Sequence, residues 1–146
     1  MKRLVLKFGG TSVGTIEKIK KVANIIKKRF SEGNEIIVVV SAMSGVTDEL
    51  KAKSDLISKN FDNQELDVLL SSGEQVSCSL LSGALIDLGV KARSWLGWQI
   101  PIVTNDNHTS SQIMKIKTDE ILNFISKKGV PVIAGFQGIS KDIRIT

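Results

Sequence analysis

The sequence contains few of the residues on which disulfides and most metal or nucleophilic centres depend. Cys78 is the only cysteine among 146 residues, which excludes a disulfide framework and every zinc or iron–sulfur pattern built from several cysteines. His108 is the only histidine, so a histidine-rich metal site is excluded and any Ser/His/Asp or Cys/His centre would have to include it. Cys78 lies between apolar helical positions and is predicted to be a small core residue. His108 lies in a polar loop, and we expect a surface or substrate-lining residue.

Long apolar runs are also missing. No segment approaches the roughly 18 apolar residues of a membrane-spanning helix. The first residues lead directly into a strand pattern and lack the apolar core of a cleavable signal peptide. With 146 residues, 42% of them hydrophobic, the chain fits about one domain and is not disordered. We therefore expect a cytoplasmic protein that does not enter the membrane.

Positive charge is concentrated near the N-terminus. Residues 1–30 hold nine Lys and Arg against one acid, and six of the nine fall within residues 18–29. Apolar residues alternate with these cations at helical spacing, which predicts a solvated helix face, and no aromatics alternate with them as single-stranded nucleic acid binding would need. We expect no nucleic-acid partner. The apolar residues expected to face inward are Ile19, Val22, Ala23, Ile25, Ile26 and Phe30.

The remaining pattern alternates short strands with helices. Residues 4–8 and 36–40 are predicted strands joined by a helix over residues 13–30, and the five β-branched residues of the second strand indicate burial on both faces. No repeat or linker divides the chain. The alternation predicts a three-layer α/β fold with a mainly parallel sheet. The other predicted elements are a weakly helical stretch over 46–58, a long helix over 66–88, short strands over 91–95 and 99–104, a helix over 119–128 capped by Thr118, and a strand over 130–134.

Three polar loops directly follow predicted strands, at residues 9–12, 41–47 and 135–138. Ligands of such folds gather outside the carboxyl ends of the strands, so we expect these loops to meet. In the first, Lys7 ends a strand, and Gly9, Gly10, Thr11 and Ser12 lead into a helix. Glycines, a helix N-terminus and a cation suit phosphate, although an ordinary turn with Ser12 as N-cap fits equally. Lys7 favours the phosphate interpretation, because a cation buried in an apolar strand needs a counter-charge.

Two further polar segments allow alternative interpretations. Hydroxyls at Ser41, Ser44 and Thr47, around Gly45, could bind phosphate oxygens or an amino-acid head group, or serve as turn and cap residues. Ser71 and Glu74 interrupt the long helix pattern and fit a capping box, which predicts that the helix restarts here. Alternatively, Glu74 is a carboxylate at a helix N-terminus that faces the ammonium group of a substrate.

Taken together, these segments resemble one family. Lys7-Phe8-Gly9-Gly10-Thr11-Ser12-Val13 is similar to the amino-terminal signature of aspartokinases. Three more segments resemble further aspartokinase motifs, in the same order and at comparable spacing: Val39-Val40-Ser41-Ala42-Met43-Ser44-Gly45-Val46-Thr47-Asp48, Ser72-Gly73-Glu74-Gln75-Val76-Ser77 and Ala134-Gly135-Phe136-Gln137-Gly138. The resemblance implies the amino acid kinase fold, an α/β/α sandwich. It also implies transfer of the γ-phosphoryl group of ATP, with Mg²⁺, to the side-chain carboxylate of L-aspartate, the first step towards lysine, threonine, methionine and diaminopimelate.

The resemblance also implies roles for individual residues. Lys7 would be the catalytic cation that neutralises charge on the phosphoryl group in flight. The ATP phosphates would lie against the loop of Gly9, Gly10, Thr11 and Ser12, with the two glycines bringing N–H groups close. Aspartate would be held by Ser41, Thr47 and Glu74, with Glu74 meeting its ammonium group and Phe136 lining the same pocket. Such a reaction needs positioning, Mg²⁺ and cationic stabilisation rather than a protein nucleophile, and no residue is assigned as a metal ligand.

Aspartokinases continue beyond these motifs with glycine-rich and acidic segments that bind the nucleotide, and then with regulatory ACT domains. Residues 1–146 are therefore expected to form a partial amino acid kinase domain, the aspartate-binding half, without the nucleotide-binding half or ACT domains. We expect such a chain to be inactive alone and to need a second chain that supplies the missing half; a homo-oligomer is compatible with the sequence. The alternative is a non-catalytic aspartate- or phosphate-binding fragment or a decayed gene product.

Overall fold

A computed structural model describes residues 2–146. Its main sheet has four parallel strands in the order β1-β2-β6-β3. The bounds are β1 (Arg3–Phe8), β2 (Glu35–Val40), β6 (Val130–Ala134) and β3 (Ala92–Trp95). The predicted α/β class with a mainly parallel sheet is confirmed.

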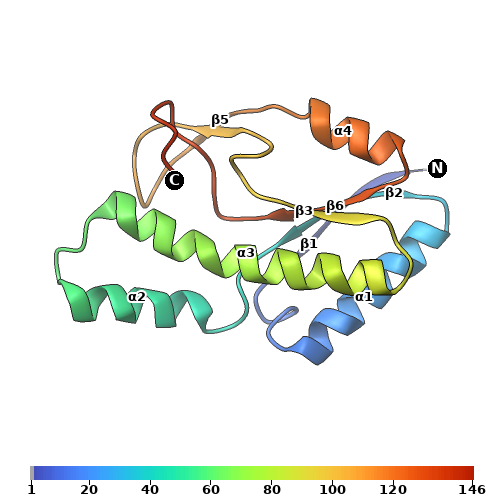
Figure 1. Cartoon of the computed structure of the whole chain (residues 1–146), viewed down its shortest axis with the longest axis horizontal. Coiled ribbons are helices and arrows are strands. Elements are labelled where there is room, and N and C mark those ends of the chain that lie inside the picture. The colour runs from blue at the N-terminus through green and yellow to red at the C-terminus, as the bar shows by residue number, and fades with distance from the viewer. Residues whose placement is uncertain (1) are drawn as a thin grey trace.

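The two faces of this sheet have different coverings (Figure 1). Helices α1 (Ile16–Ser31) and α3 (Asn63–Asp87) lie on one face, and α2 (Val46–Ile57) packs against α3. On the other face lie α4 (Asp119–Ser126) and a small antiparallel sheet of β4 (Ile102–Thr104) and β5 (Ile113–Ile116). Within residues 2–146, no helix combines the length and apolar character that crossing a bilayer requires.

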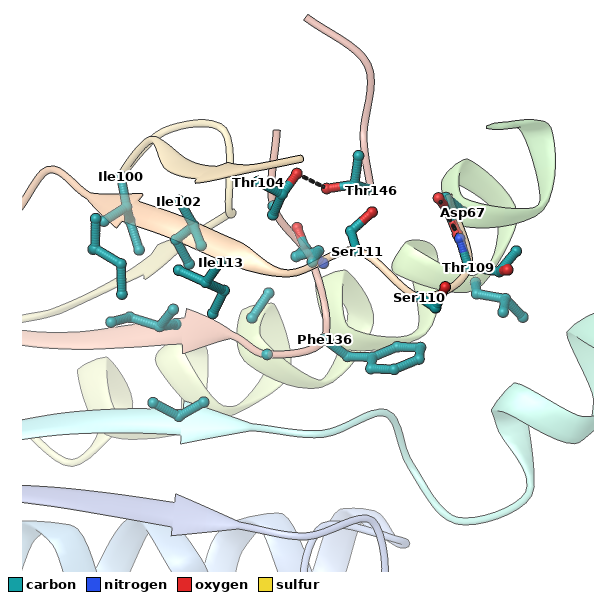
Figure 2. A pocket seen from close by; sticks show the side chains of 18 residues that line it. Asp67, Ile100, Ile102, Thr104, Thr109, Ser110, Ser111, Ile113, Phe136 and Thr146 are labelled. Carbon is teal, nitrogen blue, oxygen red and sulfur yellow. Dashed lines mark hydrogen bonds between the residues drawn. The ribbon is translucent and has the colours of Figure 1, made fainter. Parts of the chain in front are cut away.

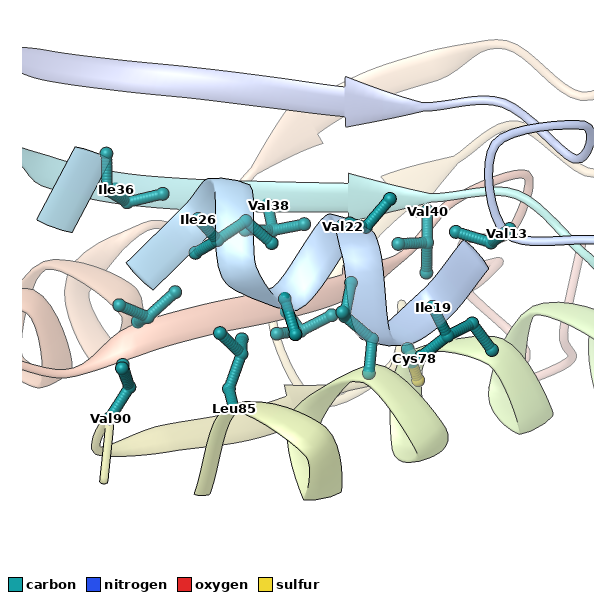
Figure 3. Close-up of a cluster of buried hydrophobic side chains, with 14 of the residues drawn as sticks. Val13, Ile19, Val22, Ile26, Ile36, Val38, Val40, Cys78, Leu85 and Val90 are labelled. Carbon is teal, nitrogen blue, oxygen red and sulfur yellow. The ribbon is translucent and has the colours of Figure 1, made fainter. Parts of the chain in front are cut away.

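The main core lies between the sheet and α1 with α3 (Figure 3). Ile36, Val38 and Val40 of β2 are fully buried there, together with Cys78 of α3. Burial raises the pKa of the Cys78 thiol to about 11, which fits an unreactive core residue. The prediction that Cys78 belongs to the core is confirmed.

The expectation that β2 is buried on both faces is only half right. Ile37 and Val39 point to the other face and are only half-buried, because the helix on that face, α4, packs mainly against β6. Ile25 of α1 is also wrongly predicted to face inward, since it is 51% exposed. At 100° per residue it lies off the helix face that Ile19, Val22 and Ile26 share.

Several element boundaries differ from those predicted. Helix α1 begins at Ile16 rather than near residue 13, and its N-cap is Thr15, whose Oγ1 accepts from Lys18 N at 3.2 Å. Strand β4 begins at Ile102 rather than residue 99, because a turn occupies the intervening residues. Strand β5 was not predicted at all. Thr118 does occupy the N-cap position of α4, but its side chain makes no capping hydrogen bond, and α4 ends at Ser126 rather than residue 128.

Candidate functional site

The carboxyl ends of β1, β2 and β6 open onto a cavity of about 480 Å³, here called the edge cavity. Loops from three distant parts of the sequence meet around it, as expected for a parallel sheet. Of the residues singled out in the sequence, the ones that line it are Lys7, Gly10, Ser41, Ser44, Gly45, Thr47, Glu74 and Phe136. The structure therefore brings together the cation, the hydroxyls and the carboxylate of the sequence motifs.

The rest of the glycine-rich loop does not line the edge cavity. Ser12 N donates to Gly9 O at 2.9 Å in a turn, and Lys18 Nζ donates to Thr11 O at 2.9 Å on the outside. Ser12 does not cap α1, because Thr15 occupies that position. Gly9, Thr11 and Ser12 therefore lie beside the site rather than in it.

Lys7 occupies an exposed position at the end of the edge strand β1. Along this strand Arg3, Val5 and Lys7 point to the open face of the sheet and the residues between them point to the core. The sequence-based concern that a cation here needs a buried counter-charge is therefore wrong. The charge of Lys7 instead stands in solvent at the mouth of the edge cavity, where it can attract an anion.

Two glycines allow the walls of the edge cavity to approach closely. A Cβ atom on Gly10 would lie 2.8 Å from Ala42 O, and one on Gly73 would lie 2.8 Å from Ala42 Cβ. Since real Cβ contacts are longer than this, any larger residue would force the β1 loop or α3 away from the loop after β2. The glycines therefore set the width of the site.

Glu74 lies in the interior of α3 and is only 3% exposed. Its Oε1 accepts from Ala42 N at 3.1 Å, and within residues 2–146 its buried Oε2 has no hydrogen-bond partner. Burial raises the pKa of this carboxyl above its ordinary value. An unpartnered buried carboxylate oxygen beside a cavity is suited to receive an ammonium group.

Both sequence interpretations of this segment placed a helix start at Ser71, and both are wrong on that point. Helix α3 runs unbroken through residues 71–74, and Ser71 Oγ donates back to Val68 O at 2.8 Å. The polar residues here do not end a helix; they face other parts of the protein. Glu74 reaches the cavity from the middle of α3, and the helix start that does lie at this cavity is that of α2, whose N-cap Gly45 lines it.

Helix α3 carries a buried row of polar residues at helical spacing, Asp67, Ser71, Glu74 and Ser77, which we call the α3 polar stripe. Together they contact three loops, and Glu74 and Ser77 share the loop after β2. Asp67 Oδ1 accepts from Thr109 N at 3.0 Å, Ser71 O from Gln137 Nε2 at 3.2 Å, and Ser77 Oγ donates to Ser41 O at 2.7 Å. The stripe thus anchors the loops that form the site. Asp67 and Ser77 were missed in the sequence, where polar residues repeating within an apolar helix were the available signal, and Gln137, in the loop after β6, was quoted only as part of a motif.

A second cavity of about 450 Å³, here called the apolar cavity, lies beside the first (Figure 2). Its floor is formed by isoleucines of the main and small sheets, and Thr109, Ser110 and Ser111 stand at its rim. His108 Nδ1 lies 2.6 Å from Asp67 Oδ2 next to this rim, so the lone histidine is paired and partly buried rather than free on the surface. Residues 135 and 136 line both cavities, and Phe136 therefore forms a wall between them.

The sequence of this chain is similar to those of known proteins. A sequence model of the amino acid kinase family matches residues 2–146. The chain belongs to the amino acid kinase family. It is 47% identical over 149 aligned positions to an aspartokinase of Rickettsia conorii, a match that covers 100% of this chain and 37% of that protein. It is 45% identical to an aspartokinase of Geobacillus stearothermophilus, covering 98% of this chain and 35% of that protein.

Solved aspartokinase structures share the fold. The aspartate kinase from Synechocystis superposes with a TM-score of 0.79 at 44% identity, over 92% of this chain and 22% of that one. Escherichia coli aspartokinase III, solved with aspartate and ADP, gives a TM-score of 0.80 at 21% identity, over 97% of this chain and 42% of that one, a likeness of fold alone. The chain spans about a third of the length of the curated relatives it matches.

Proposed function

We propose that this chain forms the aspartate-binding part of an aspartate kinase, with the edge cavity as the acid-binding site. The observation that carries the proposal is Glu74, which lines the edge cavity beside three hydroxyl residues and a lysine, and whose buried Oε2 has no hydrogen-bond partner within residues 2–146. A family relationship to proteins named aspartokinase, one of them solved with aspartate and ADP, supports the choice of substrates.

In this proposal the amino acid lies across the edge cavity. Its ammonium group pairs with Glu74 Oε2, while the hydroxyls of Ser41 and Thr47 donate to its carboxylates. Phe136 packs against the carbon chain. The side-chain carboxylate then lies towards Lys7, on the side of the cavity that opens to solvent.

The proposed reaction needs little from the protein beyond position and charge. A carboxylate oxygen of aspartate forms a bond to the γ-phosphorus of ATP, the bond from that phosphorus to the β,γ-bridging oxygen breaks, and ADP leaves with the electron pair. Lys7 neutralises charge that spreads over the transferred oxygens, and Gly10, which also lines the cavity, has no side chain to keep the phosphates from the backbone. We extend the phosphate-binding role to Gly9, Thr11 and Ser12, whose loop borders the open side of the cavity.

Mg²⁺ is proposed to arrive with ATP rather than to occupy a resident protein site. Within residues 2–146 no three His, Cys, Asp or Glu residues are grouped to hold a metal ion. Mg²⁺ does not need such a group, because in kinases the ion keeps several waters and binds mainly through substrate phosphates. When bound, the ion supplies charge neutralisation for the β- and γ-phosphates.

The half-covered face of the sheet is the proposed place for a nucleotide-binding partner. The isoleucine floor of the apolar cavity and the exposed side chains of β5 present apolar surface beside the mouth of the edge cavity. We propose that a nucleotide-binding half, carried on a second chain, packs there, in the cytoplasm and as part of the synthesis of lysine and related amino acids. A homo-oligomer of the completed unit is compatible with this arrangement.

The test is formation of aspartyl hydroxamate from ATP, Mg²⁺, L-aspartate and hydroxylamine. We expect no turnover by the 146-residue chain alone and turnover after addition of a nucleotide-binding half taken from one of the relatives. Robust turnover by the chain alone would contradict the need for a partner. Binding of aspartate without any turnover in the complemented mixture would favour the non-catalytic alternative.

The variant Lys7→Ala, measured in the same assay, tests the proposed catalytic role of Lys7. We expect the complemented variant to lose at least about 100-fold in kcat, the usual order for one lost electrostatic contact to a transition state, while aspartate still binds. Lys2→Ala, at the start of the same segment and away from the cavity, is the matched control and should behave as the wild type. Unchanged kcat in Lys7→Ala would remove Lys7 from the catalytic role.

A further inference from the structure

The wall between the two cavities has an unusual backbone. Phe136 adopts a left-handed conformation with φ of +54°, and its side chain is 72% exposed. For a residue with a Cβ atom, this conformation costs on the order of 1 kcal/mol or more and persists only where neighbouring contacts impose it. The exposed ring of Phe136 cannot supply those contacts.

The neighbouring residue, Gln137, has contacts of the required kind. Its side chain is buried, and both ends of its amide are bonded. Gly97 N donates to Gln137 Oε1 at 3.2 Å, and Gln137 Nε2 donates to Ser71 O at 3.2 Å. Gln137 therefore ties the loop after β6 to the turn after β3 and to the α3 polar stripe.

Close packing against the same glycine, Gly97, also holds this loop. A Cβ atom on Gly97 would lie 2.7 Å from Gln137 O, so the turn after β3 leaves no room for the loop to shift. The amide side chain of Gln137 is thus held between α3 and the turn after β3, and its carbonyl packs against Gly97 of that turn. With Gln137 held, Phe136 has no freedom to relax to an extended backbone.

We infer that Gln137 is a positioning residue of the acid-binding site. It holds Phe136 in its left-handed conformation, so that the ring closes the edge cavity on the side of the apolar cavity. This inference rests on the proposed function, because it takes the edge cavity to be the place where aspartate binds. Without the Gln137 amide contacts, residue 136 relaxes to φ below zero and the ring leaves the wall.

The experiment measures the dissociation constant of L-aspartate by calorimetry for the 146-residue chain. Gln137→Met keeps the length of the side chain and removes both hydrogen bonds, and we expect a Kd about tenfold higher, the effect of losing roughly one well-formed contact. Gln99→Met is the matched control: its Oε1 accepts from Leu96 N at 2.9 Å in the same turn, but it does not touch the loop of Phe136. Its Kd should stay within about twofold of the wild type, within the ordinary range for a surface change.

A double-mutant cycle separates positioning from general structure. In a Phe136→Gly background the left-handed backbone costs nothing and there is no ring to place, so adding Gln137→Met should leave the Kd unchanged. A merely structural role would raise the Kd equally in both backgrounds and overturn the inference. Gly97→Ala places a Cβ atom 2.7 Å from Gln137 O and so displaces Gln137 without changing it; this variant should have the same Kd as Gln137→Met. It provides the test if Gln137→Met fails to fold.

A second readout keeps the inference distinct from the proposed function. Amide hydrogen exchange at residues 136–138 should accelerate in Gln137→Met and not in Gln99→Met, whether or not aspartate binds. If the wild type does not bind aspartate but exchange accelerates as expected, the proposed function fails and the positioning of Phe136 stands. Unchanged exchange and unchanged Kd in Gln137→Met would overturn the inference.

Discussion

The two faces of the main sheet differ in how completely they are covered. On the α1 and α3 side, the β2 residues Ile36, Val38 and Val40 are fully buried. On the other side, α4 and the small sheet cover only part of the surface, and Val5 of β1 is 63% exposed. Glu74 comes from the packed side and Lys7 from the open side. Glu74, which we propose to bind the amino acid, is therefore supported by a fully packed core. Lys7, which we propose to bind phosphate, borders the face that a partner would cover.

The largest effect on stability is expected from a substitution in the core under the packed face. Ile26→Ala removes a fully buried side chain between α1 and the sheet and should destabilise the protein by about 2–5 kcal/mol in urea unfolding. Ile25→Ala, one residue away and 51% exposed, is the matched control and should cost less than about 1 kcal/mol. Equal losses in the two variants would contradict the assignment of the core face.

A smaller loss is expected where the packed face meets the site. Gly73→Ala places a Cβ atom 2.8 Å from Ala42 Cβ and should cost about 1–3 kcal/mol of unfolding free energy and weaken aspartate binding. Gly83→Ala lies on the same helix with nothing within 4 Å of the added atom. Because alanine favours helix over glycine, this control should stabilise by about 0.5–1 kcal/mol. A neutral Gly73→Ala would show that the width of the site is not set by this contact.

Glu74→Gln tests the buried carboxyl by which α3 contributes to the edge cavity. Because burial raises the pKa of Glu74 in the folded state, the native protein holds its proton more tightly than the unfolded chain, and wild-type stability falls as pH rises from about 4.5 through the raised pKa. The variant lacks this loss. Its advantage in urea midpoint over the wild type should therefore grow between pH 4.5 and neutral pH, and a difference independent of pH would contradict the buried, charged carboxyl.

The smallest effect is expected on the open face. Val5→Thr should change the unfolding free energy by less than about 0.5 kcal/mol, because the side chain is largely in solvent. The same replacement at Val38, which is fully buried on the packed face, should cost about 1–3 kcal/mol by burying a hydroxyl. Similar effects at the two positions would mean that the faces do not differ as described.

Elements with a strong local pattern were predictable from the sequence, and contacts over long distances were not. Strand β6 was predicted with its observed bounds, since an apolar run between Gly129 and Gly135 is a local signal. Strand β5 was missed because all four of its residues are exposed and show no alternation. The loops of the site were predicted to meet because parallel strands share one carboxyl edge.

The error at Ser71 and Glu74 has a physical cause. Polar residues within an apolar helix pattern can mark a helix end or a buried polar contact, and the sequence does not show which loop will pack there. In the α3 polar stripe, the partner of Glu74 is Ala42, 32 residues away along the chain, and the partner of Ser71 is Gln137, 66 residues away. The burial of Lys7 was wrongly predicted for a related reason, because the position of β1 at the edge of the sheet depends on the topology of the whole fold.

The most direct test of the account is a titration of the ¹⁵N-labelled chain with L-aspartate, followed by amide chemical shifts. The account predicts saturable shifts that concentrate at Ala42, Thr47 and Phe136, with saturation lost in Glu74→Gln because the ammonium group then has no charged partner. Absence of shifts at the edge cavity in the wild type, or an unchanged Kd in Glu74→Gln, would contradict the assignment of the acid-binding site.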